Sequence, residues 1–531
     1  MSTLTGVRRL TRFTLRRDRL RLSLWVIGIT STIIISAVSE KGLYTDQEKI
    51  ESYVRLFGDN PALIAFAGPG YGFDDPNIGV ILVNETQLWG MVIVALMSIF
   101  MVNRHTRAEE ASERLDLVRA NVVGRHAPTA ASTIVIAGAN LLIGLVSAVG
   151  FVVTGYAVAG SIALAASFVA VGLVFAGITA VAAQLTSSGR ATLGLGSAVL
   201  MVTFVLRVIG DIGHNVLTWL SPIGWGQAVR AYADERWWTI VFSVVVAVGL
   251  VAVSFWLSVR RDIGSGIIAA RPGPAVAALW LTKPLGLAYR LHRGSLFAWP
   301  IGLFVTGLAF GSIGNDIDTM IEDNPQLADF LTSTGGGSLV DAYWAVAMTM
   351  MALVACGFTI STTLALRTEE GEGRAESMLA GPLARDRWAG SHLLLAVAGT
   401  VVTIAAGGAG VGIGYAVVSD DPGQVVRLTA ASLVTVPAAM VLLGVTVALY
   451  GLVPKLALLA WGVLAFVSLV DYLGEVLRLP QWVRRMSPFE HLPDVPAHSM
   501  QWTPLLALTA LAAALTALGL WGLRRRDIAV H

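Results

Sequence analysis

The chain has 531 residues, of which 55% are apolar and only 14% are charged, and its mean hydropathy is +0.70. Soluble domains carry about 25% charged residues, so this composition excludes both a soluble enzyme and a disordered chain. The single cysteine, Cys356, excludes an intrachain disulfide framework and a cysteine-rich metal site.

Twelve segments are apolar over a length that can cross a membrane as a helix, which takes about 20 residues. Six lie in the first half of the chain, at about 22–38, 82–102, 131–159, 162–184, 192–210 and 238–258. Six lie in the second half, at about 296–314, 340–364, 391–418, 425–450, 453–473 and 503–523. We therefore predict an all-α membrane protein with about 12 transmembrane helices.

The basic residues predict the orientation, because cytoplasmic loops of membrane proteins carry an excess of Lys and Arg. Arginines are dense before the first span, after the second, between the halves and at the C-terminus, whereas the loops after the first and seventh spans are acidic. We expect a multi-pass protein of the plasma membrane with both termini in the cytoplasm. The basic stretch 4–22 fits either an interfacial helix on the anionic inner leaflet or simple orienting charge.

Short motifs recur in the same order in the two halves, at offsets between 260 and 274 residues. The clearest pairs are Arg16 and Arg19 with Arg290 and Arg293, Arg107-Ala108-Glu109-Glu110 with Arg367-Thr368-Glu369-Glu370, Ser221-Pro222 with Ser487-Pro488, and Arg260-Arg261-Asp262-Ile263 with Arg525-Arg526-Asp527-Ile528. Six spans per half bring both halves into the membrane in the same direction, so we predict two parallel six-helix repeats. The predicted boundaries are a first half at 1–258, a cytoplasmic linker with an interfacial helix at 259–295, and a second half at 296–531.

No part of the chain reads as a catalytic or nucleotide-binding domain. The phosphate-binding pattern G-x-x-x-x-G-K-[ST] does not occur in the sequence, and the histidines lack metal-ligand spacing. We therefore predict no catalytic residue, no bound metal or cofactor and no nucleic-acid partner. The glycine-rich run 407–414 has GxxxG spacing inside a span, which predicts close helix packing.

The cytoplasmic segments 103–129 and 366–390 are the strongest functional candidates. Each begins with Arg-x-Glu-Glu, continues with alternating charges and then presents an apolar patch. A short helix of this kind suits docking on another protein, where charges set register and orientation. An ordinary solvated loop is the alternative, and the occurrence of the pattern in both halves favours docking.

Six spans per half, with an Arg/Glu-rich helix between spans two and three, resemble the permease of an ABC-2-type (type V) exporter. Ala380-Gly381-Pro382 matches the small-residue–proline turn of that family, whereas Ala120-Asn121-Val122 in the first half lacks the proline. The docking geometry of the first half is accordingly less defined. The whole duplicated chain resembles the fused permeases of actinobacterial polyketide-antibiotic exporters of the tetronasin type.

This resemblance implies a permease subunit that moves lipophilic or amphiphilic compounds, such as antibiotics and drugs, out of the cell. Two copies of a separate ATPase subunit would bind ATP and Mg and dock beneath the permease, which itself has no ATPase domain. The remaining partners would be membrane lipid and the lipophilic substrate. The docking residues that the resemblance implies are Glu109, Glu110, Arg114, Glu369, Glu370 and Arg374.

Two further groups of residues are candidates for the transport path. Charges near the ends of spans five and eleven are candidates for an external gate: Arg207, Asp211, Asp471 and Glu475. The first two can pair at i, i+4 spacing, and simple hydration at the interface is the alternative. Large adaptable side chains in spans two and eight are candidates for the substrate path, with ordinary packing as the alternative: Trp89, Met97, Tyr343 and Trp344.

Two other classes of protein compete with the exporter permease. A proton-coupled drug antiporter of the major-facilitator type also has two six-span halves, but the Gly-x-x-x-Asp-Arg-x-Gly-Arg-like loop of that class does not occur after span two. A membrane-embedded lipid or polyprenyl-phosphate transferase would need clustered polar catalytic groups on one membrane face. The external acidic residues form no recognisable site of that kind.

Overall fold

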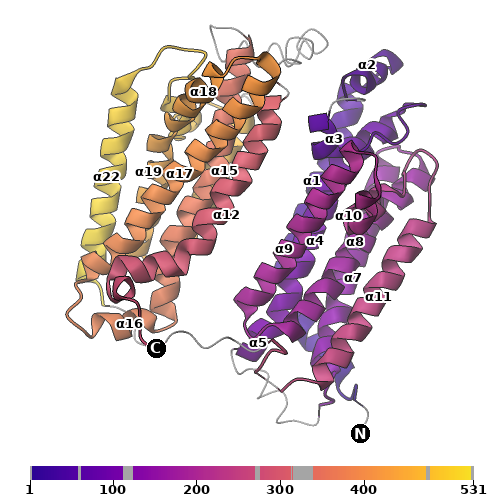
Figure 1. The fold of residues 1–531 in the computed structure, drawn as a ribbon, viewed down its shortest axis with the longest axis horizontal. Coiled ribbons are helices and arrows are strands. Elements are labelled where there is room, and N and C mark those ends of the chain that lie inside the picture. The colour runs from indigo at the N-terminus through magenta and orange to yellow at the C-terminus, as the bar shows by residue number, and fades with distance from the viewer. Residues whose placement is uncertain are drawn as a thin grey trace. The chain divides into compact units, whose positions relative to one another are not determined.

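The computed structural model describes residues 3–57, 61–111, 123–262, 264–268, 275–312, 314, 339–473 and 479–527. The chain divides into two compact units, Met1–Gly273 and Pro274–His531, and each is a bundle of helices (Figure 1). Across the described ranges, all of the regular secondary structure is helical, as the apolar runs predict.

Eleven of the described helices are long and apolar enough to cross a membrane. The segment predicted at 453–473 is shorter than expected, because its helix, α20, runs only from Leu459 to Leu473. Pro454 accounts for the late start, since it has no N–H to donate and stands in the 3-10 turn η3 (Pro454–Leu456). The all-α fold with about 12 apolar helices is confirmed, with one of them short.

The described part of the first unit has six long helices. They are α1 (Val7–Leu43), α4 (Ile78–His105), α7 (Ala127–Val153), α8 (Val158–Leu185), α9 (Gly189–Ile212) and α11 (Trp238–Val259). The short helices are α2 (Gln47–Phe57), α3 (Pro61–Ala67), α5 (Arg107–Ala111), η1 (Val216–Leu220) and α10 (Pro222–Gln227). Because α1 is continuous, the basic residues from Val7 onward begin the same helix that forms the first span.

The second unit follows the same order. Its longer helices are α12 (Pro284–Ser312), α15 (Leu339–Gly371), α17 (Arg385–Ser419), α18 (Gly423–Leu433), α19 (Val436–Leu452), α20 and α22 (Trp502–Arg525). The short elements besides η3 are η2 (Leu279–Thr282), α16 (Arg374–Leu379), α21 (Gln481–Arg484) and η4 (Phe489–His491). Since α12 begins at Pro284, the last part of the segment predicted as linker belongs to the seventh long helix.

The two units repeat the same helix neighbours. In the first unit, α8 packs against α4, α7, α9 and α11, while α1 packs against α4 and α7. In the second unit, α18 and α19 together replace α8 and pack against α15, α17, α20 and α22, while α12 packs against α15 and α17. The repeat of sequence motifs is therefore also a repeat of helix packing.

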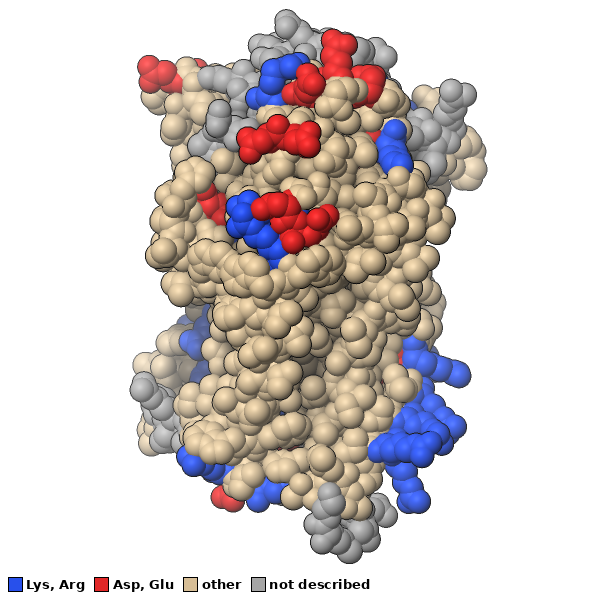
Figure 2. Space-filling view, turned by 90° about the vertical axis from the view of Figure 1, so that its right-hand side faces the viewer, with Lys and Arg blue, Asp and Glu red and all other residues tan. Residues whose placement is uncertain are grey.

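Charges are separated along the first unit. Figure 2 shows a face with most of its acidic side chains, together with some basic ones, toward one end, mostly basic side chains toward the other, and a belt without either between them. A belt of this kind matches the apolar interior of a bilayer, where ionised side chains are costly. The basic end contains the segments that the sequence predicts to be cytoplasmic.

Helices α12 and α17 approach each other closely along a line of glycines. A Cβ atom on Gly307 would stand 2.2 Å from the carbonyl oxygen of Gly407, and one on Gly410 would stand 2.2 Å from that of Phe304. Small residues allow such backbone contact, which is a main source of helix association in membranes. The close packing predicted for the run 407–414 is confirmed.

We predict that Gly410→Ala separates α12 from α17 and lowers the melting temperature of the purified chain, because the added methyl group meets backbone rather than a movable side chain. Overpacking of this kind costs about 1–3 kcal/mol. Gly390→Ala is the matched control on the same helix, since nothing lies within 4 Å of its added Cβ. An equal loss in both variants would contradict the packing argument.

Candidate functional site

Glu110 in α5 lies in a buried ion-pair network at the basic end of the first unit. Arg261 reaches both of its carboxylate oxygens, Nη1 at 2.7 Å and Nη2 at 2.9 Å, and Arg107 donates to it at 2.7 Å. The backbone N–H of Gly264 adds a fourth bond at 2.6 Å. The Glu110 side chain is only 5% exposed, so its charge is compensated inside the unit.

Glu370, at the end of α15, has the same role in the second unit. Both of its carboxylate oxygens receive bonds of 2.6 Å from the guanidinium of Arg526, and the Tyr450 hydroxyl donates a third bond of 2.6 Å. The Glu370 side chain is 8% exposed. Two parallel N–H···O bonds of this kind are a strong, directional form of ion pair.

A second arginine holds the end of the last long helix in each unit. Arg125 donates to the carbonyl oxygens of Ser258 at 3.0 Å and Val259 at 3.1 Å, where α11 ends. Arg385 donates to the carbonyl oxygen of Arg526 at 2.7 Å, just beyond the end of α22. A cation at a helix C-terminus satisfies carbonyls that have no partner within the helix and stabilises the helix dipole.

These contacts join motifs that repeat separately in the sequence. The Arg-x-Glu-Glu motif after the second long helix contacts the Arg-Arg-Asp-Ile motif after the last one, in both units. We call this arrangement the Glu–Arg clamp and define it as Glu110, Arg261 and Arg125 in the first unit, and Glu370, Arg526 and Arg385 in the second. In the first unit the clamp holds the short loop helix α5 against the end of the bundle, and in the second unit it holds the end of α15, next to α16.

The predicted docking residues are therefore placed differently from our expectation of exposed charges. The side chains of Glu110, Glu369 and Glu370 are nearly inaccessible, and Glu109 is only partly exposed and forms an ion pair with Arg17. Glu369 receives two bonds from Arg374, at 2.9 and 2.7 Å. Arg114 lies outside the described residues. Charge reversal at Glu110 or Glu370 would set a positive charge against Arg261 or Arg526 of the clamp, so it would not test docking alone.

A further buried polar cluster, which sequence reasoning missed, ties α1 to α4. Asp18 is 2% exposed and accepts bonds from Arg104 at 3.2 and 3.0 Å, with His105 3.3 Å away. The corresponding residue of the second unit is His292, whose ring nitrogen lies 3.0 Å from that of His392. The charge before the first apolar run hinted at Asp18, but its partners lie 86 and 87 residues away.

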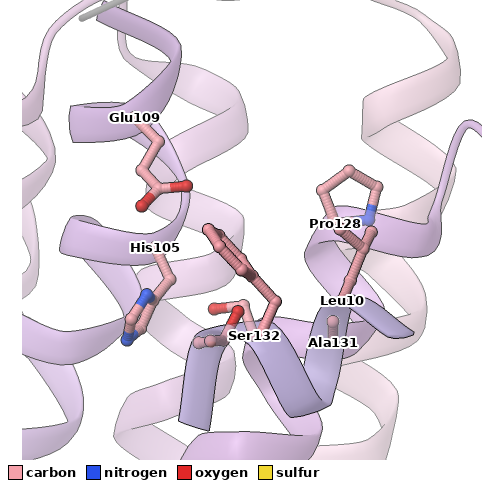
Figure 3. Close-up of a pocket in the computed structure, with 8 residues that line it drawn as sticks. Leu10, His105, Glu109, Pro128, Ala131 and Ser132 are labelled. Atoms are coloured by element: carbon pink, nitrogen blue, oxygen red, sulfur yellow. The ribbon is translucent and has the colours of Figure 1, made fainter. Parts of the chain in front are cut away.

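A small cavity adjoins this cluster in the first unit (Figure 3). His105 and Glu109 come from the end of α4 and from α5, and Ala131 and Ser132 come from α7. Its volume of about 30 Å³ holds roughly one water molecule and excludes a drug-sized ligand. This cavity is therefore not the substrate site.

The candidate gate residues lie in two different environments. Arg207 and Asp211 pair at 3.4 Å with side chains only 0% and 1% exposed, so simple hydration does not describe them. Arg207 also donates to the carbonyl oxygens of Ile64 at 3.0 Å and Ala65 at 2.9 Å in α3, which anchors that helix to α9. Asp471 is bonded to Ser487 at 3.2 Å, and Glu475 lies outside the described residues.

The candidate path residues do not form one surface. Met97 and Trp344 are completely buried in the cores of their own units. Tyr343 is partly buried and packs against the ring of Trp344 at 5.0 Å. Trp89 alone of the four is exposed, at 43%, and its ring lies 5.9 Å from that of Phe66.

We predict that the clamp stabilises each unit through coupled charges. Glu110→Ala and Arg261→Ala should each lower the free energy of unfolding by at least about 2 kcal/mol, because each leaves a buried charge without its partner. In a double-mutant cycle the coupling should be at least about 1 kcal/mol, and the same holds for Glu370 and Arg526. The measurement is SDS titration of the purified variants.

The matched control for this cycle is Arg524→Ala. Its ion pair with Asp386 lies at the same end of the second unit, but the two side chains are 64% and 38% exposed. Exposed pairs contribute about 0–1 kcal/mol. Additive effects of the clamp variants, or an equal effect of Arg524→Ala, would refute the coupling.

Comparison with known proteins agrees with this architecture. A family model described as the C-terminal domain of the multidrug efflux system permease Rv1217c matches residues 281–524. The multidrug efflux system permease protein Rv1217c of Mycobacterium tuberculosis is 39% identical over 529 residues, which is 99% of this chain and 95% of that protein. The chain belongs to this family of multidrug efflux permeases.

Proposed function

We propose that the chain is the membrane subunit of an ATP-driven exporter of the ABC-2 type, which moves lipophilic or amphiphilic compounds out of the cell. ATP and Mg would be bound by a separate subunit in two copies. The observation that carries the proposal is the duplicated Glu–Arg clamp, which holds the short helix α5 in the first unit and the end of α15, next to the short helix α16, in the second. A pair of equivalent surfaces suits a partner that binds twice.

In the second unit, α16 offers the better-defined docking surface. Glu376 and Ser377 on this helix are exposed, as are Ala380, Gly381 and Pro382 in the turn that follows. Ala375 is completely buried and fixes the opposite side of the helix to the bundle. The exposed side of the helix is thus polar and is followed by an exposed turn of small residues and proline. Packing and the nearby clamp hold the helix in place, as a rigid-body contact requires.

The first experiment is purification of the chain from its native membrane in mild detergent. We expect a stoichiometric partner with a phosphate-binding loop and vanadate-sensitive ATP hydrolysis. A chain that purifies alone, without ATPase activity, and whose transport collapses with a protonophore would overturn the proposal in favour of a proton-coupled antiporter.

We predict that Glu376→Arg reduces the amount of co-purifying ATPase subunit by at least about half, because rim charges set the orientation of encounter. Its melting temperature should stay close to that of the wild type, since surface substitutions usually change stability by less than about 0.5 kcal/mol. Glu51→Arg, an exposed charge reversal on α2 in the first unit, is the control. Equal retention of the partner in both variants would place docking elsewhere.

A further inference from the structure

A group of acidic and aromatic side chains lies where α1, α2 and α4 meet, away from the clamp. Glu40 is near the end of α1, Tyr53 is on α2, and Asn84 and Glu85 are in the second turn of α4. The hydroxyl of Tyr53 lies 2.6 Å from a carboxylate oxygen of Glu85 and 2.7 Å from the side-chain oxygen of Asn84. Glu85 also lies close enough to act electrostatically on Glu40.

This group has more acceptors than donors. Glu40 is 4% exposed, its Oε1 accepts one bond from Ser36 at 3.0 Å, and its Oε2 has no hydrogen-bond partner. The single hydroxyl proton of Tyr53 serves only one of its two acceptors at a time. Two carboxylates thus share very few donors, although a buried acceptor without a partner costs about 1–3 kcal/mol.

Within the described part of the chain, positive charge does not compensate these carboxylates. Among the described residues, no Lys, Arg or His forms an ion pair with Glu40 or Glu85. The neighbouring Lys41 is directed elsewhere, since its amino group donates to the carbonyl oxygen of Gly155 at 2.9 Å and lies 4.9 Å from the ring of Tyr156. The site therefore holds carboxyl groups without a cationic partner, and a cation bound from outside would supply that partner.

Aromatic rings cluster around Tyr53, whose hydroxyl contacts Glu85. Tyr44 packs edge-on against Tyr53 at 5.3 Å, and Phe57 stacks on Tyr53 at 4.1 Å. Glu85 and Trp89 are both exposed and four residues apart, so they share one face of α4. Carboxylates beside aromatic faces recognise organic cations, because the ring quadrupole attracts positive charge and the ring surface accepts apolar substituents.

The positions that correspond to the two carboxylates in the second half of the sequence are not acidic. The offsets of the flanking repeat motifs, 274 for Arg16 and Arg290 and 260 for Arg107 and Arg367, pair Glu40 with Gly314 and Glu85 with Ala345. The repeated motifs therefore do not themselves call for an acid at either position, and the two carboxylates are a feature of the first unit.

We propose that Glu40 and Glu85, with the rings of Tyr53 and Trp89, form a binding site for lipophilic organic cations in the first unit. The proposal rests on the proposed function as an exporter subunit and names one substrate class for it. Glu85 and Trp89 meet the ligand at the surface, and the buried Glu40 carboxyl group provides an inner acceptor that a bound cation would favour in its ionised form. Neutral lipophiles of similar shape gain the ring contacts without the charge interaction.

The test measures binding of tetraphenylphosphonium to the full chain in detergent by equilibrium dialysis. Glu85→Gln should raise its Kd by about tenfold, a loss of roughly 1.4 kcal/mol, and Glu40→Gln with Glu85→Gln should raise it further. Triphenylphosphine oxide is the neutral probe, and its Kd should change by less than about twofold in the same variants, since the rings remain. Glu51→Gln, an exposed residue on α2, is the control for a change in net charge.

Three results would overturn the proposal: unchanged binding in the double variant, an equal loss in Glu51→Gln, or an equal loss for the neutral probe. Melting temperatures identify any variant that has unfolded, and Glu85→Gln alone then decides, because that side chain is exposed. Binding needs no ATPase subunit, so tetraphenylphosphonium binding by a chain that purifies alone would retain the cation site and reject the ATP-driven exporter.

Discussion

The buried pair between a glutamate at the cytoplasmic-motif end of the second long helix, on α5 in one unit and on α15 in the other, and an arginine beyond the last long helix organises each unit. Removing two charges from water is costly, and the attraction between them repays that cost only when the geometry is good and the remaining oxygens are satisfied. Both glutamates meet this condition, with an arginine on both oxygens and at least one further donor. The pair joins the second long helix to the sixth, which are otherwise separated by about 150 residues of chain.

Around this shared clamp the two units differ. The contact of α12 with α17 is made through glycine backbone at Gly307 and Gly410, whereas both glycines of α1, Gly28 and Gly42, have nothing within 4 Å of a built Cβ. Asp18 is bonded to Arg104 and lies beside His105 in one unit, while a His292–His392 contact occupies the corresponding place in the other. A duplicated scaffold that keeps the clamp and varies its polar interior can hold different functions in its two halves.

Much of the fold could be predicted from the sequence, because apolar length and motif order are local properties. The helical runs, the repeat and the glycine packing at 407–414 all follow from such signals. The short α20 was missed, since hydropathy alone does not register that Pro454 delays a helix start. The pairing of Glu110 with Arg261 could not be predicted either, because an alternating charge pattern is the same whether its partner is solvent or a distant arginine.

The same limit applies to the transport path. Trp344 and Met97 are residue types that could line a substrate path, but both side chains are completely buried in the core of their own unit. Of the candidate path residues, only Trp89 is exposed. Exposure, rather than residue type, therefore separates packing from function here. The clamp adds a mechanical consequence. A bidentate ion pair resists sliding, so a displacement of α5 must be shared by the end of α11, and a displacement of the end of α15 must be shared by the end of α22. Each of these two rigid links couples the end of the second long helix to the end of the last long helix in its unit. A force applied at the basic end of a unit therefore moves both helices together.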